Sequence, residues 1–336
     1  MAVVRLTSGK TFESEEGSTI LDAATRVGIT IPYSCKTGRC STCKCKIVAG
    51  QTKTLTEELG LTEIEKSEGW ILSCVRNPIT DLVIDVEDFG GFHIPEATMH
   101  VCRIASLDKL AQDVIKVILR LPPNVAFNFI PGQYIEVVGP GGIRRSYSIA
   151  NAPVETNTLE LHVRAVENGK MSQYWFNQSA PNDLLRFHGP LGTFFMRNIA
   201  KRDLIFLATG TGIAPIKAML EALSSAVKDE LPQSITVVWG ARYAQDLYFD
   251  VVPLCGVQSY IPVLSRAEES WQGDRGYVQD ALLRHMPDLR NGIVYACGSE
   301  VMIRSARSTL VAAGLPGEKF YSDAFVCSDT AQLKIT

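Results

Sequence analysis

Five cysteines lie within the first 74 residues of this 336-residue chain, and their spacing suggests metal chemistry. Cys35, Cys40 and Cys43 follow the pattern C-x4-C-x2-C, and Cys74 stands further along the chain. Four thiolates with this spacing are typical of a [2Fe–2S] cluster. Sulfur ligands suit iron, and the short loop lets three of them converge. We therefore predict that Cys35, Cys40, Cys43 and Cys74 ligate iron, whereas Cys45 fits no ligand position.

Two other interpretations of these cysteines stay open at this point. One is a zinc ion bound by Cys40, Cys43, Cys45 and Cys74, although zinc sites usually show two C-x2–4-C pairs and only one is clean here. The other is a group of reduced structural cysteines. A disulfide framework is disfavoured because the total of nine cysteines is odd.

Composition and charge limit the classes of protein to be considered. The chain has 46% hydrophobic and 21% charged residues, as an ordinary globular protein does. Its formal net charge of −3 gives no sign of a nucleic-acid partner. We see no signal peptide, and no apolar run approaches the roughly 18 residues that a membrane span needs. We expect a cytoplasmic protein with no membrane partner, in which clustered cysteines favour metal over disulfides.

Hydrophobic periodicity divides the chain into three predicted domains and a linker. Residues 1–90 hold a hairpin-like alternating stretch, a helix-like segment and a further strand. Residues 91–98, in a stretch with Gly and Pro, are the predicted linker. Residues 99–198 hold short β-rich runs between Gly, Pro or Asn, which favours an antiparallel sandwich or barrel. Residues 199–336 alternate strands with helices, which favours a doubly wound parallel sheet.

The stretch RRSYSIAN, residues 144–151, holds residue types that suit a flavin. The guanidinium of Arg145 could pair with a flavin phosphate, the ring of Tyr147 could pack on the isoalloxazine, and Ser148 could offer a hydroxyl near N5. Gly169 and Ser172 stand at a predicted helix start, where backbone N–H groups suit a pyrophosphate. Taken alone, the first stretch is also compatible with an ordinary edge strand.

Two strand ends in the last third suit a nucleotide. In ATGTGIAP, residues 208–215, Gly210 and Gly212 would let the backbone approach a pyrophosphate. The stretch is not a full G-x-G-x-x-G fingerprint, so a simple tight turn is the alternative. Cys297 and Gly298 end another predicted strand, where α/β sheets bind ligands. The alternative for Cys297 is a buried cysteine that acts as a small hydrophobe.

Taken together, these segments resemble the ferredoxin–NADP reductase family, with a plant-type ferredoxin domain placed first. The resemblance covers essentially the whole chain and rests on YSCKTGRCSTCKCKIVAG, RRSYSIAN, HVRAVENGKMSQYW, GPLGTFF, ATGTGIAP, YACGSEVM and YSDAF. It implies a multidomain α+β and α/β fold. The expected parts are a β-grasp ferredoxin domain, an antiparallel flavin-binding β-barrel that holds FAD, and a doubly wound parallel-sheet nucleotide-binding domain.

The resemblance also implies roles for individual residues. At the FAD it implies Arg145, Tyr147, Ser148, His162, Val163, Arg164, Gly169, Lys170, Met171 and Ser172. At the nicotinamide nucleotide it implies Thr209, Gly210, Thr211, Gly212, Cys297 and Gly298. At the 2′-phosphate of NADP-specific members it implies Ser265, Arg266, Arg275 and Tyr277. In catalysis it implies Ser148, Cys297, Asp323 and Phe325, although the chain runs on beyond Phe325.

The function implied is electron transfer. NADH or NADPH would reduce FAD, and electrons would pass through the [2Fe–2S] cluster to an electron-acceptor protein. Because many relatives with the ferredoxin domain first prefer NADH, the choice between NADH and NADPH is open. The likeness is greatest to members that serve a sugar-nucleotide dehydratase of dideoxysugar synthesis. The alternatives are an oxygenase component, either a Rieske dioxygenase or a multicomponent monooxygenase, and a stand-alone redox module with no dedicated acceptor.

Overall fold

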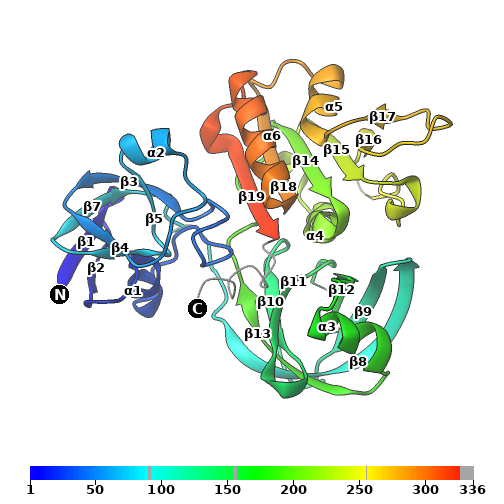
Figure 1. Ribbon diagram of the computed structural model, residues 1–336, viewed down its shortest axis with the longest axis horizontal. Coiled ribbons are helices and arrows are strands. Elements are labelled where there is room, and N and C mark those ends of the chain that lie inside the picture. Colours follow the sequence, from blue (N-terminus) through cyan, green and yellow to red (C-terminus); the bar gives the residue numbers. More distant parts are fainter. Residues whose placement is uncertain (90–91, 154–156, 255, 326–336) are drawn as a thin grey trace. The chain divides into compact units, whose positions relative to one another are not determined.

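The computed structural model describes residues 1–89, 92–153, 157–254 and 256–325. Contacts divide the chain into two units, Met1–Ile94 with the C-terminal segment from Asp323, and Pro95–Ser322 (Figure 1). This division does not separate the predicted barrel from the predicted nucleotide-binding segment. The domain boundaries at residues 90, 98 and 198 therefore stay predictions.

A five-stranded mixed sheet, a two-stranded sheet and two helices form the described part of the first unit. It contains β1 (Ala2–Leu6), β2 (Thr11–Ser14), β3 (Lys44–Ala49), β4 (Thr52–Thr54), β5 (Trp70–Leu72), β6 (Arg76–Pro78), β7 (Leu82–Asp85), α1 (Ile20–Arg26) and α2 (Glu63–Ser67). Five strands lie in the order β2-β1-β7-β3-β5, with β1 and β7 parallel. Alternate residues of β1 are buried, as a half-covered strand requires. This is the predicted β-grasp arrangement.

Six antiparallel strands form a barrel at the start of the second unit. They are β8 (Thr98–Ala111), β9 (Val114–Arg120), β10 (Tyr134–Val138), β11 (Arg144–Ser148), β12 (Thr158–Arg164) and β13 (Leu184–Leu191), in the order β11-β10-β13-β8-β9-β12. A bridge between Ile149 and Leu161 and a 2.8 Å bond from Ala150 N to Glu160 O join the two outer strands. The sheet therefore closes as a barrel and not as a sandwich.

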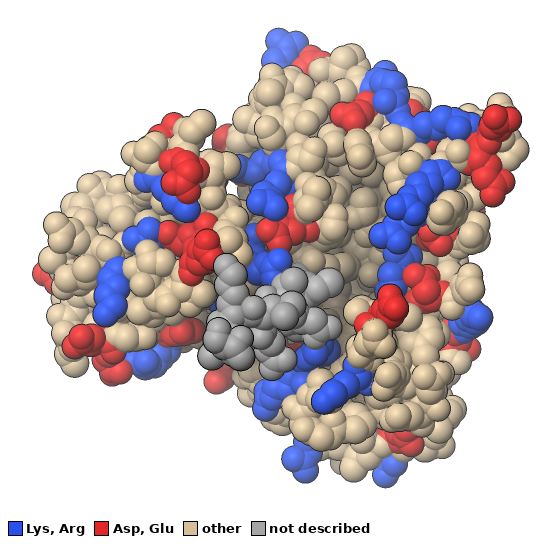
Figure 2. Space-filling view, viewed as in Figure 1, with Lys and Arg blue, Asp and Glu red and all other residues tan. Residues whose placement is uncertain are grey.

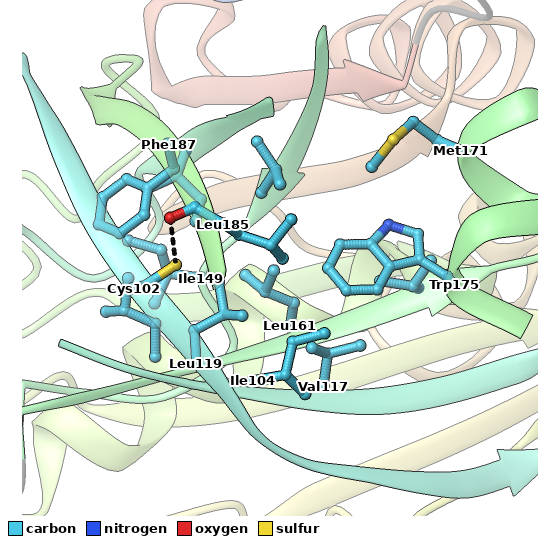
Figure 3. Packing of buried hydrophobic residues seen from close by; sticks show 14 of the residues in the cluster. Cys102, Ile104, Val117, Leu119, Ile149, Leu161, Met171, Trp175, Leu185 and Phe187 are labelled. Atoms are coloured by element: carbon cyan, nitrogen blue, oxygen red, sulfur yellow. Dashed lines mark hydrogen bonds between the residues drawn. The ribbon is translucent and has the colours of Figure 1, made fainter. Parts of the chain in front are cut away.

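Apolar side chains fill the barrel interior (Figure 3). Ile104, Val117 and Leu161 come from strands, as the alternation of a barrel wall requires. The helical segment adds Met171 and Trp175 through α3 (Lys170–Gln173) and the π-helical turn Tyr174–Gln178 that follows it. The segment that carries predicted flavin residues is thus fixed to the barrel by its own apolar side chains.

A mainly parallel sheet with helices forms the rest of the second unit and continues to Phe325. Its elements are β14 (Asp203–Thr209), β15 (Ser234–Ala241), β16 (Ser259–Leu264), β17 (Asp274–Arg275), β18 (Gly292–Ser299), β19 (Phe320–Phe325), α4 (Ile213–Leu223), α5 (Val278–His285) and α6 (Glu300–Ala312). The strand order is β17-β16-β15-β14-β18-β19. Winding reverses between β14 and β18, so the sheet is doubly wound as predicted. Such a reversal is where open α/β sheets bind ligands.

The sequence analysis did not predict the short elements of the first unit. β4, β5, β6 and α2 are each three to five residues long. The start of α2 nonetheless carried a signal, because Thr62 and Glu65 form a capping box. β8 begins at Thr98, which is the last residue of the predicted linker.

The surface and the helices add two observations on possible partners. On the face shown in Figure 2, basic and acidic side chains are interspersed, with wide uncharged areas between them. Among the residues that the structure describes, none of the helices has the length and apolar character needed to cross a bilayer.

Candidate functional site

The loop with three of the predicted iron ligands turns on residues with left-handed backbone. Lys36, Gly38 and Ser41 have φ values of 56°, 74° and 62°. A Cβ on Gly38 would lie 2.7 Å from Glu57 O, so only glycine fits there. Residues without glycine's freedom adopt such angles at a cost of about 1–3 kcal/mol each, and they cluster at functional sites.

The four predicted iron ligands stand as two pairs. Cys43 Sγ donates to Cys74 Sγ over 3.1 Å, and Cys40 Sγ accepts from Cys35 N over 3.5 Å. A side-chain hydrogen bond with the Cys40 thiol lowers the pKa of Cys35 to about 5, and the side-chain bond with Cys74 raises the pKa of Cys43. A [2Fe–2S] cluster takes two ligands at each iron, so two pairs of thiols fit it.

One zinc ion would instead need several ligands around a single point. Within the described residues, no three His, Cys, Asp or Glu side chains gather in that way. Cys45 belongs to neither pair: it is fully buried on β3 opposite Ile71, and burial raises the pKa of its thiol to about 12. It behaves as a small buried hydrophobe.

A bridging segment, Leu55–Gly60, connects the two loops that carry these cysteines. Its Gly60 N donates to Gly38 O at 2.8 Å, in the loop with three cysteines. Its Leu55 N donates to Val75 O, also at 2.8 Å, next to the fourth cysteine. Together with the pairing of Lys44 on β3 with Leu72 on β5, the bridging segment therefore fixes the distance between the two loops.

Glu58, in the middle of the bridging segment, is a buried carboxylate with 4% of its surface exposed. Its Oε1 accepts from Leu72 N at 2.7 Å and its Oε2 pairs with Arg76 Nη2 at 2.5 Å. Leu72 and Arg76 lie two residues to either side of Cys74. The carboxylate thus holds the loop of the fourth thiol from both ends.

The predicted flavin residues of β11 lie at the edge of the barrel. Tyr147 OH accepts from Trp175 Nε1 at 2.9 Å, and burial raises the pKa of Tyr147 to about 12, so the phenol stays neutral. Arg145 Nη1 donates to Arg144 O at 2.8 Å. Ser148 is buried and pairs with Tyr134 of β10.

On β12, His162, Val163 and Arg164 face different surroundings. His162 and Val163 are buried, and the His162 ring lies 2.7 Å from Glu160 Oε1 and 3.1 Å from Tyr248 OH. Burial lowers the pKa of His162, which keeps its ring neutral. The Arg164 side chain is 33% exposed and its Nε lies 3.3 Å from Asp113 Oδ2, but its Nη2 is buried and has no hydrogen-bond partner among the described residues. An unpaired buried guanidinium nitrogen fits an absent anionic or polar ligand.

The predicted pyrophosphate residues lie where α3 begins. Gly169 is its N-cap, and a Cβ there would come within 3.1 Å of Val166 O. Ser172 Oγ accepts from Val166 N at 2.8 Å, so this hydroxyl already organises the turn. Lys170 is exposed, whereas Met171 is buried and its Sδ lies against Gly139.

The predicted nucleotide residues of two strands meet at the carboxyl ends of β14 and β18. A Cβ on Gly212 would lie 2.1 Å from Cys297 O, and a Cβ on Gly298 would lie 2.1 Å from Thr209 Oγ1. A Cβ on Gly210 would lie 2.8 Å from Arg164 Nη1. Thr211 lies between the two glycines of the 3-10 turn Gly210–Gly212. These glycines form a side-chain-free cradle that fits the backbone approach to a dinucleotide.

The four residues predicted at a 2′-phosphate differ in exposure and in the hydrogen bonds that their side chains already make. The guanidinium of Arg275 donates to carbonyls of Ala267, Glu268, Glu269 and Trp271 at 2.8–3.3 Å. Ser265 Oγ donates to Ala241 O at 3.3 Å. The side chains of Arg266 and Tyr277 are exposed. The loop therefore presents Arg266 and Tyr277 to solvent and uses Arg275 within itself.

Asp323 and Phe325 lie on β19, and Phe325 is 38% exposed. The segment 326–336, about which the sequence left a question, lies outside the described residues.

The sequence analysis missed Glu58, Lys217 and Tyr248. Lys217 carried a signal, because it is the only cation in the otherwise largely apolar run IAPIKAMLEAL. Glu58 carried no such signal, since the sequence alone does not distinguish it from its exposed neighbour Glu57.

Comparison with known proteins supports this arrangement. Residues 4–78 match the family described as 2Fe-2S iron-sulfur cluster binding domain, residues 101–196 the oxidoreductase FAD-binding domain, and residues 206–308 the oxidoreductase NAD-binding domain. The CDP-6-deoxy-L-threo-D-glycero-4-hexulose-3-dehydrase reductase of Yersinia pestis is 40% identical over 326 residues, which cover 96% of this chain and 97% of that protein.

Two further likenesses span nearly the whole chain. The phenol hydroxylase P5 protein of Acinetobacter pittii is 33% identical over 334 residues, 95% of this chain and 92% of that protein. The solved structure of Amycolatopsis cytochrome P450 reductase matches with a TM-score of 0.74 and 27% identity, and covers 97% of this chain and 99% of that one.

Iron–sulfur, FAD and NAD domains in one chain define an NAD(P)H-dependent oxidoreductase that passes electrons from the nicotinamide through FAD and a [2Fe–2S] cluster to a partner protein. Within that class, the chain belongs to the ferredoxin–NADP reductase family, as a member with a [2Fe–2S] ferredoxin domain. The zinc interpretation of the cysteines is thereby overturned.

The buried Glu58 contact generates a test of the bridging segment. Glu58→Gln should destabilise the first unit by about 2 kcal/mol, because the charge-assisted bonds to Leu72 N and Arg76 are weakened. The cluster's visible absorption should be lost at a lower temperature and lower urea concentration. The matched control is Glu57→Gln, which removes the same charge from an exposed neighbour. Equal loss curves for the two variants would refute this account of Glu58.

Proposed function

We propose that this reductase delivers electrons to a sugar-nucleotide dehydratase, the CDP-4-keto-6-deoxyglucose 3-dehydratase of dideoxysugar synthesis. It would then act as a CDP-6-deoxy-Δ-3,4-glucoseen reductase. The observation that carries the proposal is 40% identity, end to end, with the dehydrase reductase of Yersinia pestis. The oxygenase-linked relatives reach 31–33% over a similar length. We also propose that it works in the cytoplasm, where thiols stay reduced.

A second candidate is the reductase component of a Rieske ring-hydroxylating dioxygenase or a multicomponent monooxygenase. The terephthalate 1,2-dioxygenase reductase component 1 of Comamonas supports it, with 31% identity over 95% of each chain. The two candidates share the same cofactors and differ in the acceptor alone.

When bound, the cofactors supply the chemistry: a hydride from NAD(P)H carries two electrons to FAD, and the electrons pass singly through the cluster to the acceptor, with one proton released per NAD(P)H. For the cluster, we propose that Cys35 and Cys40 hold one iron and that Cys43 and Cys74 hold the other. The two close contacts within these pairs support this division.

For the flavin, the barrel residues are proposed to bind and orient FAD. Arg164 supports this best, because its buried Nη2 has no hydrogen-bond partner among the described residues. The proposed set is Arg145, Tyr147, Ser148, His162, Val163, Arg164, Gly169, Lys170, Met171 and Ser172.

For the nicotinamide nucleotide, the glycine cradle at β14 and β18 is proposed to take the pyrophosphate and the nicotinamide. The proposed set is Thr209, Gly210, Thr211, Gly212, Cys297 and Gly298. Ser148, Cys297, Asp323 and Phe325 stay proposed catalytic residues, which shape the geometry of hydride transfer.

For a 2′-phosphate, Ser265, Arg266, Arg275 and Tyr277 stay the proposed residues for NADPH. Because the donors of Arg275 already serve four carbonyls, we propose that Arg266 provides the main charge.

The first prediction from the proposed function concerns the iron ligands. Cys74→Ser should lose iron and the visible and paramagnetic signals of the cluster, while NADH still bleaches the flavin. Cys45→Ala removes a neighbouring buried thiol outside the proposed set and should keep its iron. Iron retained in Cys74→Ser, or lost in Cys45→Ala alone, would mean that the ligand set is wrong.

The second prediction concerns the choice of nucleotide. Arg266→Ala should lower kcat/KM for NADPH about tenfold, since one charge-assisted contact to the phosphate is lost, and should leave kcat/KM for NADH nearly unchanged. Steady-state cytochrome c reduction measures both. A mutant whose NADPH-to-NADH ratio equals that of the wild type would remove Arg266 from the site.

The third prediction concerns the partner. With NADH, the purified protein should support turnover of the CDP-sugar by the dehydrase that works with the Yersinia pestis reductase. It should do so about tenfold faster than it supports the phenol hydroxylase oxygenase of Acinetobacter pittii. Cytochrome c reduction serves as the control for an active reductase. Faster turnover with the oxygenase would favour the second candidate. A protein that reduces cytochrome c but supports turnover by neither partner enzyme would reject both candidates.

A further inference from the structure

A network of charged and polar side chains lies between β12 of the barrel and α4 of the parallel sheet, both within the second unit. We call it the β12–α4 network; its members are Glu160, His162, Lys217, Glu221 and Tyr248. Lys217 Nζ donates to Glu221 Oε1 at 2.6 Å, to Ala150 O at 3.1 Å and to Glu160 Oε2 at 3.2 Å. An ammonium has three donors, and these contacts use all three.

The two carboxylates extend the network on either side of Lys217. Glu221 Oε2 accepts from Ala152 N at 2.9 Å, which ties α4 to the end of the barrel. Glu160 Oε1 lies 2.7 Å from His162 Nε2. Because a carboxylate can only accept, Nε2 carries the proton, and Nδ1 of the neutral ring accepts from Tyr248 OH at 3.1 Å. Every member therefore has a defined donor or acceptor.

Two routes lead from this network to the turn Gly210–Gly212. In one, Lys217 sits about one helical turn into α4, which starts directly after Gly212. In the other, the Tyr248 ring packs edge-on against Trp239 with centroids 5.1 Å apart, and Trp239 Nε1 donates to Gly210 O at 3.0 Å. The network thus joins the strand of the proposed flavin residues to the loop of the proposed nucleotide residues.

Stability alone does not account for this arrangement. Side chains of Glu160 and Lys217 are 17% and 15% exposed, so both charges are largely desolvated. Such ion pairs are often no more stabilising than well-packed apolar residues, but in some proteins they select one arrangement of the parts that they join. Hydride transfer needs just such a constraint, because a misplacement of about 1 Å costs about a hundredfold in rate.

We propose that Lys217 and Glu160 are positioning residues that fix the spacing between β12 and the turn Gly210–Gly212, and hence between flavin and nicotinamide. This inference rests on the proposed function of both sites. It concerns residues that belong to neither proposed cofactor-binding set and act through His162 and α4.

The test compares flavin reduction in full-length holoprotein variants. Lys217→Met removes the ammonium but keeps much of the chain's bulk, and Lys217→Arg restores the charge. Glu160→Gln keeps the shape of the side chain and removes only its charge. This second variant still tests the proposal if the Lys217→Met protein fails to bind FAD. The matched control is Lys228→Met, which removes an exposed lysine from the same part of the unit.

The readouts are the limiting rate of flavin bleaching by NADH in single turnovers, the isotope effect with NADH deuterated at C4, and FAD content per chain. We expect Lys217→Met to lower the limiting rate about ten- to hundredfold and to change the isotope effect at normal FAD content. Glu160→Gln should change both in the same direction and less. Lys217→Arg should recover most of the rate, and Lys228→Met should match the wild type.

Three results would overturn the proposal. In the first, Lys217→Met and Glu160→Gln both keep the wild-type rate per bound flavin and the wild-type isotope effect. The network would then have only a structural role. In the second, Lys217→Arg is as slow as Lys217→Met. In the third, Lys228→Met slows as much as Lys217→Met. A wild-type protein whose flavin is bleached by neither NADH nor NADPH would instead contradict the proposed function, so the two failures are distinguishable.

Discussion

The close approach of β14 and β18 is the constraint on which the second unit depends. The two strands pair in parallel with Ala208 opposite Cys297, and their ends come so near that Gly212 has no room for a Cβ beside Cys297 O. The reversal of winding at this point brings the loops of both strands to one edge of the sheet. Glycine at these positions is therefore required by packing before any ligand binds. The same closeness leaves bare backbone for a dinucleotide.

The first unit solves a similar problem with a different device. Its thiols come from two loops far apart in sequence, which are joined where Lys44 of β3 pairs with Leu72 of β5 and Ser73 N donates to Cys43 O at 3.1 Å. The bridging segment adds backbone bonds to both loops, with Glu58 buried in its middle. Removing one partner of such a buried contact costs much more than the contact contributes against an apolar alternative. The geometry of the thiol pairs is therefore set by residues that are not themselves candidate ligands.

How much of this could be read from sequence depends on the range of the interaction. The long periodic runs around β14, α4 and α6 were predictable, because each is decided by its own hydrophobic pattern. The cysteine spacing and the glycines at 210 and 212 were predictable because local chemistry needs them. Short elements such as β4 and β6 depend on pairing with each other, which no local pattern encodes. Glu58 and Lys217 acquire their partners from segments 14 to 67 residues away, so their roles become visible only in three dimensions.

Both buried charge centres share one property that bears on electron transfer. Glu58 with Arg76 joins the bridging segment to the loop of the fourth thiol, and Lys217 with Glu160 and Glu221 joins α4 to β12. Apolar packing in the same places would constrain the arrangement less, since the hydrophobic effect is not directional. A charged contact with all its donors paired permits one arrangement and penalises the others. Electron and hydride transfer depend on fixed separations, so a reductase gains from charges buried at these joints even where they add little net stability.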